Sequence, residues 1–132
     1  MPWLDPASRP RILLTTLPNE PHSIGLSMAE LLLLLEGCRC VSLGVQTPIW
    51  DIVLAATSQR SDVVALSFTS VLTPTLVSEG LTELRAKLSS SVEIWAGGAA
   101  PVLHRRPTPG VTALESLSRI ASQTERWRAE RA

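Results

Sequence analysis

The stretch RILLTTLPNEPHSIGLSMAELLLLLEG, residues 11–37, decides the fold because it contains a strand, a loop and a helix in succession. Its first seven residues form an apolar run that predicts a buried strand over 11–17. Its second half predicts a helix over 23–36 that stops at Gly37, a residue favoured just after a helix ends. Leu31 to Leu35 is apolar all round the helix, which indicates a helix that is largely buried or covered by a partner.

The same alternation of strand and helix continues along the chain. Thr47 is predicted to cap a helix with Pro48 in its first turn. The other predicted elements are strands over 39–43, 62–68, 92–98 and 110–114, helices to about 59, over 74–88 and over 114–131, and a short helix or loop around 101–106. Apolar strands separated by helices predict an α/β fold with a doubly wound, five-stranded parallel sheet between two helical layers, a flavodoxin-like (Rossmann-like) sandwich.

The composition bounds the class of protein. With 132 residues the chain is long enough for one domain, predicted over 11–132, after an N-terminal extension over 1–10. The formal net charge is zero, so direct nucleic-acid binding is not expected. No apolar run is long enough to span a membrane, and the start of the chain lacks a signal-peptide pattern, so we expect a cytoplasmic protein.

In a sheet of this kind, ligands bind outside the carboxyl ends of the strands. The loops that matter are therefore 17–25, 44–47, 67–74, 97–101 and the segment after 113. The first loop lacks the glycine pattern of dinucleotide sites and the Ser/Thr-rich phosphate loop of flavodoxins. The acidic residues of phospho-receiver domains and a Walker A loop are also absent. The common ligands of this fold are thereby disfavoured.

The first loop instead offers Glu20 and His22, a carboxylate two residues from an imidazole. Histidine is a common metal ligand, and its second ring nitrogen usually donates to a carboxylate or carbonyl oxygen. One histidine cannot hold a free metal ion, but it can supply an axial ligand to a metal already held by a macrocycle. The residues alone therefore suggest a macrocyclic metal cofactor at the carboxyl edge of the sheet.

These residues also carry a family resemblance. Glu20-x-His22-x-x-Gly25 resembles the D/E-x-H-x-x-G signature of cobalamin-binding domains, over roughly residues 11–125. Three further segments resemble the family's other elements: LGVQTP (43–48), the S-x-L element at Ser70–Leu72, and the glycine pair Gly97-Gly98. Glutamate in place of aspartate makes the domain of MerR-type light-responsive cobalamin regulators the most similar subgroup. Asn19 replaces a glycine of that subgroup, and asparagine also tolerates left-handed backbone geometry.

The resemblance implies a role for each matching residue. His22 would be the lower axial ligand of cobalt, replacing the nucleotide base (base-off, His-on), with Glu20 hydrogen-bonded to its other nitrogen. Gly25 would admit the displaced nucleotide tail between sheet and helix. The other implied cofactor-binding residues are Ser23, Thr47, Ser67, Ser70, Leu72, Gly97 and Gly98. Two points stay open: Ser67 or Ser70 can supply the serine of the S-x-L element, and Thr47 either touches the corrin edge or only caps its helix.

The implied cofactor is cobalamin, as adenosylcobalamin or methylcobalamin. The glutamate of the motif favours a sensory and regulatory module that responds to light. The alternatives are a corrinoid carrier that shuttles a methyl group between methyltransferase subunits, and a ligand-free interaction domain. No residues are arranged for acid–base or nucleophilic catalysis, so we do not expect an enzyme. The sequence shows no helix-turn-helix segment and no helical bundle, so a protein partner or further domains are expected to cover the upper corrin face.

Overall fold

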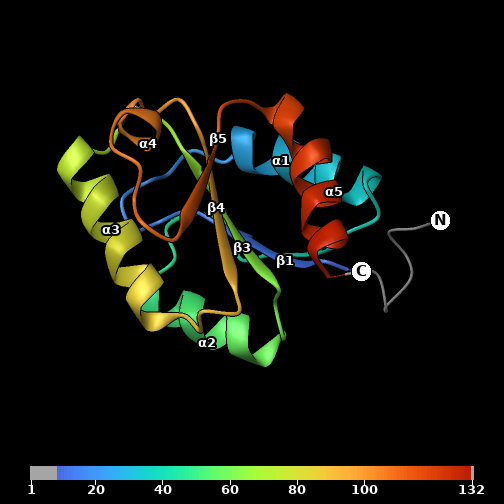
Figure 1. Cartoon of the computed structure of the whole chain (residues 1–132). Helices are drawn as coiled ribbons and strands as arrows, with labels where there is room; N and C mark the ends of the chain where they lie inside the picture. The colour runs from blue at the N-terminus through green and yellow to red at the C-terminus, as the bar shows by residue number, and fades with distance from the viewer. Residues whose placement is uncertain (1–8, 132) are drawn as a thin grey trace.

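The structure is a computed structural model that describes residues 9–131, so most of the predicted N-terminal extension lies outside the described residues. Helices and strands alternate along the chain as the sequence predicts (Figure 1). In chain order the elements are β1 (Arg11–Thr15), α1 (Ile24–Leu35), β2 (Arg39–Ser42), α2 (Ile49–Ser58), β3 (Val63–Phe68), α3 (Pro74–Lys87), β4 (Glu93–Gly98), α4 (Val102–Arg105), β5 (Val111–Leu114), the short 3-10 helix η2 (Leu117–Arg119) and α5 (Ile120–Glu130).

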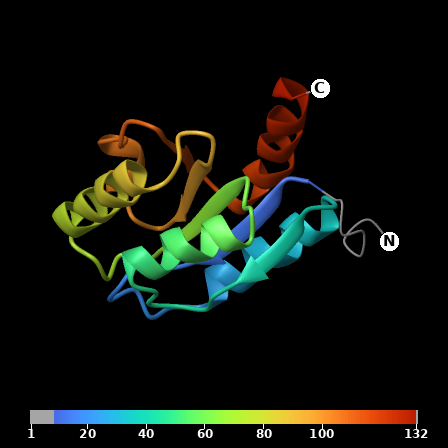
Figure 2. The same ribbon diagram turned by 90° about the horizontal axis from the view of Figure 1, so that it is seen from below.

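The five strands form one parallel sheet in the order β2-β1-β3-β4-β5. This order confirms the predicted doubly wound, flavodoxin-like fold. Helices α1 and α5 lie on one side of the sheet, and α2 and α3 lie on the other (Figures 1 and 2). Because every strand runs in the same direction, the loops that follow β1, β3 and β4 meet at one edge.

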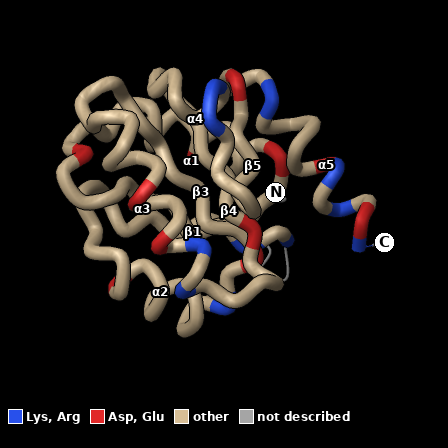
Figure 3. Tube along the Cα trace, turned by 60° about the vertical axis from the view of Figure 1, so that its left-hand side comes forward, with Lys and Arg blue, Asp and Glu red and all other residues tan. Residues whose placement is uncertain are grey.

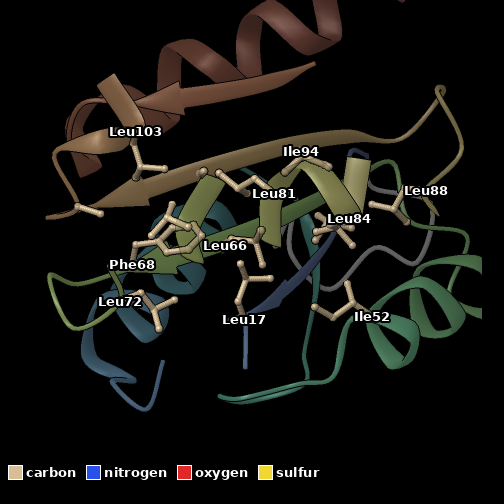
Figure 4. Close-up of a cluster of buried hydrophobic side chains, with 14 of the residues drawn as sticks. Leu17, Ile52, Leu66, Phe68, Leu72, Leu81, Leu84, Leu88, Ile94 and Leu103 are labelled. Atoms are coloured by element: carbon tan, nitrogen blue, oxygen red, sulfur yellow. The ribbon is translucent and has the colours of Figure 1, made fainter. Parts of the chain in front are cut away.

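Each face of the sheet has its own hydrophobic cluster, because successive side chains of a strand point to opposite faces. Leu66 points toward α2 and α3, where it packs with Leu84 and other large side chains (Figure 4). Leu13 belongs to the same cluster. Leu14 and Ala65, their neighbours in the same strands, belong to the cluster under α1 and α5. The sheet is therefore buried on both faces, as its continuous apolar strands predict.

Two predictions about the helices need correction, and a third is narrowed. Thr47 does not cap α2: Pro48 occupies the N-cap position and no side chain caps the helix, because the Thr47 hydroxyl bonds to Thr15 instead. The last helix does not begin at Leu114, which ends β5; α5 begins at Ile120, after η2. For helix α1 the sequence left two alternatives, burial within the domain or cover by a partner, and the structure excludes burial on all sides. The helix buries Leu26 and Leu33, while four of its large apolar residues are exposed: Ile24, Met28, Leu31 and Leu35.

Charged residues are unevenly distributed over the described chain. Acidic and basic residues both lie in the C-terminal half of α5, whereas long stretches of the other elements carry no charge (Figure 3). Within α5, Arg126 bonds to Glu93 of β4 and so ties the helix to the sheet. Among residues 9–131, no helix has both the length and the hydropathy that crossing a membrane requires.

Candidate functional site

The loop between β1 and α1 places Glu20 and His22 together at the carboxyl edge of the sheet. The Nδ1 atom of His22 lies 2.9 Å from Oε2 of Glu20. The Glu20 side chain is 1% exposed, whereas the His22 side chain is 56% exposed. Asn19 precedes the pair with φ of 70°, the left-handed geometry that asparagine tolerates. The loop thus turns the carboxylate inward and leaves the imidazole at the surface.

Thr69, the first residue after β3, holds the Glu20 carboxylate in place. Its backbone N–H donates to Oε1, and its hydroxyl lies 2.9 Å from Oε1 and 3.0 Å from Oε2. Burial alone raises the pKa of Glu20, but the hydrogen bonds from Thr69 and His22 outweigh burial and hold this pKa below its usual value. Glu20 is therefore ionised at neutral pH.

The ionised carboxylate fixes the tautomer of His22. A carboxylate only accepts hydrogen bonds, so Nδ1 of His22 must be the donor, and Nε2 of the neutral ring then carries a free lone pair. None of residues 9–131 hydrogen-bonds this Nε2 atom. The arrangement presents one exposed imidazole nitrogen, oriented by a buried negative charge, which is the usual geometry of a histidine that ligates a metal.

Thr15 and Thr16, at the end of β1, hydrogen-bond the loop that follows β1 and the loop that follows β2. The Thr16 hydroxyl donates to the Glu20 carbonyl oxygen at 2.6 Å and accepts from the N–H of Gln46 at 2.8 Å. The Thr15 hydroxyl lies 2.6 Å from the Thr47 hydroxyl and 2.8 Å from the carbonyl oxygen of Gly44. Both threonines are fully buried. Thr47 therefore links the loop between β2 and α2 to Thr15 at the end of β1, and it does not cap α2.

A cavity of about 400 Å³ opens beside this loop, between the sheet and helices α1 and α5. Gly25 borders it at the start of α1, and Ser67 and Gly97 border it from neighbouring positions of β3 and β4. Most of the remaining wall is apolar. Its other residues are Leu14, Leu26, Ala29, Leu33, Ala65, Leu66, Trp95, Gly98, Ala99, Leu114, Glu115, Ser116, Leu117 and Ile120.

The three glycines of the site serve different purposes. A Cβ atom on Gly25 would lie 2.9 Å from Oγ of Ser67, so a side chain there would close the gap between α1 and β3. Gly98 has φ of +117°, and a Cβ would lie 1.9 Å from the carbonyl oxygen of Phe68, so the fold itself requires glycine. A Cβ on Gly97 would meet only ordinary contacts, the nearest at 3.6 Å. Gly97 therefore keeps the cavity open and is not needed by the backbone.

Comparison with known proteins decides the family. The family model described as B12 binding domain matches residues 10–114. The chain belongs to the B12-binding domain family. Cobalamin is the cofactor of this family, so the predicted family and cofactor are both confirmed.

Two curated relatives of this B12-binding domain carry out different tasks. The HTH-type transcriptional repressor CarH of Myxococcus xanthus is 34% identical over 93 residues, covering 70% of this chain and 31% of CarH. Methionine synthase of Mycobacterium leprae is 31% identical over 91 residues, covering 68% of this chain and 8% of the synthase. The chain thus spans less than a third of the length of either relative.

A solved structure is similar in fold. A cobalamin-binding protein from Desulfitobacterium hafniense DCB-2 has a TM-score of 0.71 and 23% identity, over 91% of this chain and 59% of that one. At this identity the likeness shows the fold alone.

Two predicted site residues lie away from the cavity of this B12-binding domain. Ser70 and Leu72 border a separate hollow with Ala100 and Pro101. Beyond Phe68 the chain turns toward α3, and Leu72 packs into the cluster on the opposite face of the sheet. Of the two candidate serines, Ser67 is the one that borders the cavity, whereas Ser70 and Leu72 do not border it.

Ser23 and Thr69 complete the account of the site. Ser23 is the exposed N-cap residue of α1, and its side chain makes no capping hydrogen bond. Sequence reasoning missed Thr69, although its position directly after β3, at the ligand-binding edge, was an available signal. The B12-binding domain therefore has a Glu20–His22–Thr69 cluster beside the cavity.

The site fits a corrinoid on two structural observations. Among residues 9–131, no group of three or more His, Cys, Asp or Glu side chains could hold a metal ion by itself. His22 offers a single nitrogen, which suits a metal that a macrocycle already holds in its plane. The neighbouring cavity, with Gly25 and Gly97 in its wall, provides room for an appended apolar group.

Proposed function

We propose that this B12-binding domain binds cobalamin base-off, with Nε2 of His22 as the lower axial ligand of cobalt, and acts as a sensory and regulatory module. One observation carries the ligand assignment: the buried carboxylate of Glu20 binds Nδ1 of His22 at 2.9 Å and leaves Nε2 free at the carboxyl edge of the sheet. The orientation of the imidazole is thereby set before any ligand arrives.

The remaining residues receive roles from their positions. Glu20, held by Thr69, raises the basicity of the His22 ring through its hydrogen bond. Gly25, Ser67 and Gly97 border the cavity that would take the displaced nucleotide tail. Gly98 holds the turn that follows β4. Bound cobalamin supplies a cobalt ion whose upper axial group can be exchanged or removed, and the protein orients it.

The sensory role is supported by the relation to the repressor CarH and by glutamate at position 20. In this account, ligand binding or light changes the upper face of the corrin, and a protein partner or further domain that covers this face responds. The module itself is not expected to contact nucleic acid.

A corrinoid carrier is the second candidate, favoured by the relation to methionine synthase. A carrier would present the upper face of the corrin to separate methyltransferase proteins in turn. The same His22 coordination serves both roles, so coordination does not distinguish them. The two roles are distinguished by whether the assembly responds to light.

The test is reconstitution of the purified protein in the dark with adenosylcobalamin or methylcobalamin, followed by absorption spectroscopy. The proposal predicts retained corrinoid with a His-on spectrum that His22→Ala abolishes. His104→Ala is the matched control, because His104 is the other histidine of the chain and is exposed. If no corrinoid is retained, the ligand-free interaction domain becomes the better description.

Illumination then separates the two roles. Light scattering on the reconstituted protein, before and after exposure, reports the mass of the assembly. A light-driven change in mass, absent from His22→Ala, supports the sensor. An unchanged mass together with methyl transfer to an added methyltransferase supports the carrier.

A further inference from the structure

The cavity beside α1 is polar only at its outer end. Ser67 and Gly97 are paired in neighbouring strands at this end, next to Leu114. The other polar side chains of the lining, Glu115 and Ser116, directly follow β5. Apart from the indole N–H of Trp95, every polar side-chain group that borders the cavity therefore lies at the carboxyl edge of the sheet.

The inner end is closed by one rung of the sheet, formed by Leu14, Ala65 and Trp95. Leu14 pairs with Ala65, and Ala65 pairs with Trp95. This rung lies two residues further into the sheet than Ser67, or about 7 Å at the usual rise of a strand. Because residues two apart share a face, all three side chains lie under α1 and α5.

The walls of the inner part are apolar as well. Helix α1 contributes Leu26, Ala29 and Leu33, and α5 contributes Ile120. The backbone polar groups of the strands, and of α1 beyond its first turn, are bonded within the sheet and the helix. A ligand group that enters the inner part therefore meets carbon atoms and finds no side-chain donor or acceptor.

Trp95 carries the only polar side-chain atom of the inner rung, and that atom is already occupied. Its Nε1 donates to Oε1 of Glu93 at 2.9 Å. Glu93 is held in turn by Arg126 at 2.8 Å and Arg131 at 3.3 Å. This network lies toward the amino end of β4, away from the cavity opening. The indole N–H is thus not available to a ligand.

We propose that this inner cavity selects the lower base of the corrinoid and accepts an apolar benzimidazole in preference to adenine. The proposal rests on the proposed function, because the base enters the cavity only when His22 has displaced it from cobalt. A methylated benzimidazole has apolar edges that match the walls. The exocyclic amine of adenine would be buried without a partner among Leu14, Ala65 and Trp95, which is costly.

The test is a set of dissociation constants, measured by titration with three corrinoids: cobalamin, its analogue with adenine as lower base, and cobinamide, which lacks the nucleotide tail. We expect cobalamin to bind at least about tenfold more tightly than the adenine analogue, the ratio that one unpaired buried donor produces. Cobinamide is also expected to bind more weakly than cobalamin. Equal or tighter binding of the adenine analogue, or equal binding of cobinamide, would overturn the proposal.

Amino-acid substitutions test whether the inner rung is what selects the lower base. Ala65→Ser adds a hydroxyl group beside Trp95 and is expected to lower the preference for cobalamin at least severalfold. Ala29→Ser places a hydroxyl on the α1 wall and serves if Ala65→Ser does not fold. Ala129→Ser, on the exposed side of α5, is the matched control and should leave the ratio unchanged. An unchanged ratio in both cavity variants contradicts the proposal.

The outcomes also separate this inference from the proposed function. If all three corrinoids bind with His22-dependent spectra and equal affinity, selection by the cavity is wrong and His22 coordination stands. If none of the three binds, the proposed function itself fails.

Discussion

The two faces of the sheet are built from the same strands and differ in how completely they are packed. On the face under α2 and α3, Leu13 belongs to the same buried cluster as Leu66, Leu81 and Leu84. Figure 4 shows the last three packed together. On the face under α1 and α5, the neighbouring residues Leu14 and Ala65 border a cavity of about 400 Å³. The face under α2 and α3 is closely packed. The face under α1 and α5 is packed less completely, and its cavity is the space in which we propose that part of the ligand binds.

Small residues mark the difference between the faces. Gly25, Ala29, Ala65 and Gly97 all border the cavity, at positions where larger side chains would fill it. A cavity lined by carbon loses the dispersion contacts that a packed core would make. We therefore expect substitutions on the two faces to have unequal effects on stability and on ligand binding.

The largest effect on stability is expected when a large side chain on the packed face is shortened. Leu84, on α3, is fully buried, and Leu84→Ala should lower the free energy of unfolding by about 4 kcal/mol. Leu26, on α1, already faces the cavity, so Leu26→Ala removes fewer contacts and should cost about 2 kcal/mol. Urea denaturation of both variants measures the difference. Equal losses would show that the two faces are equally packed in solution.

The glycine pair gives the next largest contrast. Gly98→Ala forces a side chain onto a left-handed residue and against the carbonyl oxygen of Phe68, and should cost about 2–3 kcal/mol. Gly97→Ala meets only ordinary contacts and should change stability by less than about 1 kcal/mol.

Gly97→Ala has the smaller expected effect on stability, but it should have a clear effect on ligand binding. Its added methyl group enters the outer end of the cavity, so Gly97→Ala should weaken cobalamin binding while the fold is retained. Thermal unfolding and titration with cobalamin test the two halves of the prediction. A Gly97→Ala variant that is as unstable as Gly98→Ala would contradict the separate roles of the two glycines.

A smaller effect than those of Leu84→Ala and Gly98→Ala is expected from the charge that orients the site. The pKa of Glu20 is lower in the folded protein than its ordinary value of 4.5. A lowered pKa means that the unfolded chain binds the proton more tightly. The stability that Glu20 contributes is therefore present above pH 4.5 and is lost as the pH falls through the folded pKa.

Glu20→Gln tests this contribution. At neutral pH it should lower the free energy of unfolding by about 1–2 kcal/mol, because the hydrogen bonds to a charged acceptor are lost. The fall of stability toward acid should also become shallower, though not flat, because Asp62 and Glu93 have lowered pKa values as well. Glu79→Gln, on the exposed side of α3, is the control. If stability falls toward acid as steeply in Glu20→Gln as in the parent protein, Glu20 does not make the proposed contribution.

Much of this arrangement could be predicted from sequence, because it depends on local patterns. The apolar strands, Gly37 after α1 and the loop from Asn19 to Gly25 were sufficient to predict a parallel sheet with Glu20 and His22 at its carboxyl edge. Strand direction then brings the other loops to the same edge without knowledge of side-chain contacts.

Side-chain partners were the part that local patterns could not settle. Thr69 and Ser70 are adjacent hydroxyl residues, and only the turn after β3 decides which of them meets Glu20. Thr47 has the sequence context of a helix cap, but its hydroxyl bonds to Thr15, a residue distant in sequence. Helix α1 is apolar all round, yet only one of its sides faces the sheet, so Leu31 and Leu35 remain exposed.

The most direct test of the account is electron paramagnetic resonance of the protein loaded with cob(II)alamin, after growth with ¹⁵N-labelled histidine. The account predicts that the nitrogen splitting of the cobalt signal changes from a triplet to a doublet on labelling, in the parent protein and in His104→Ala but not in His22→Ala. That result would place a histidine nitrogen on cobalt and identify it as His22. A triplet that persists in the labelled protein would show that the cofactor keeps its own base, and would contradict coordination by His22.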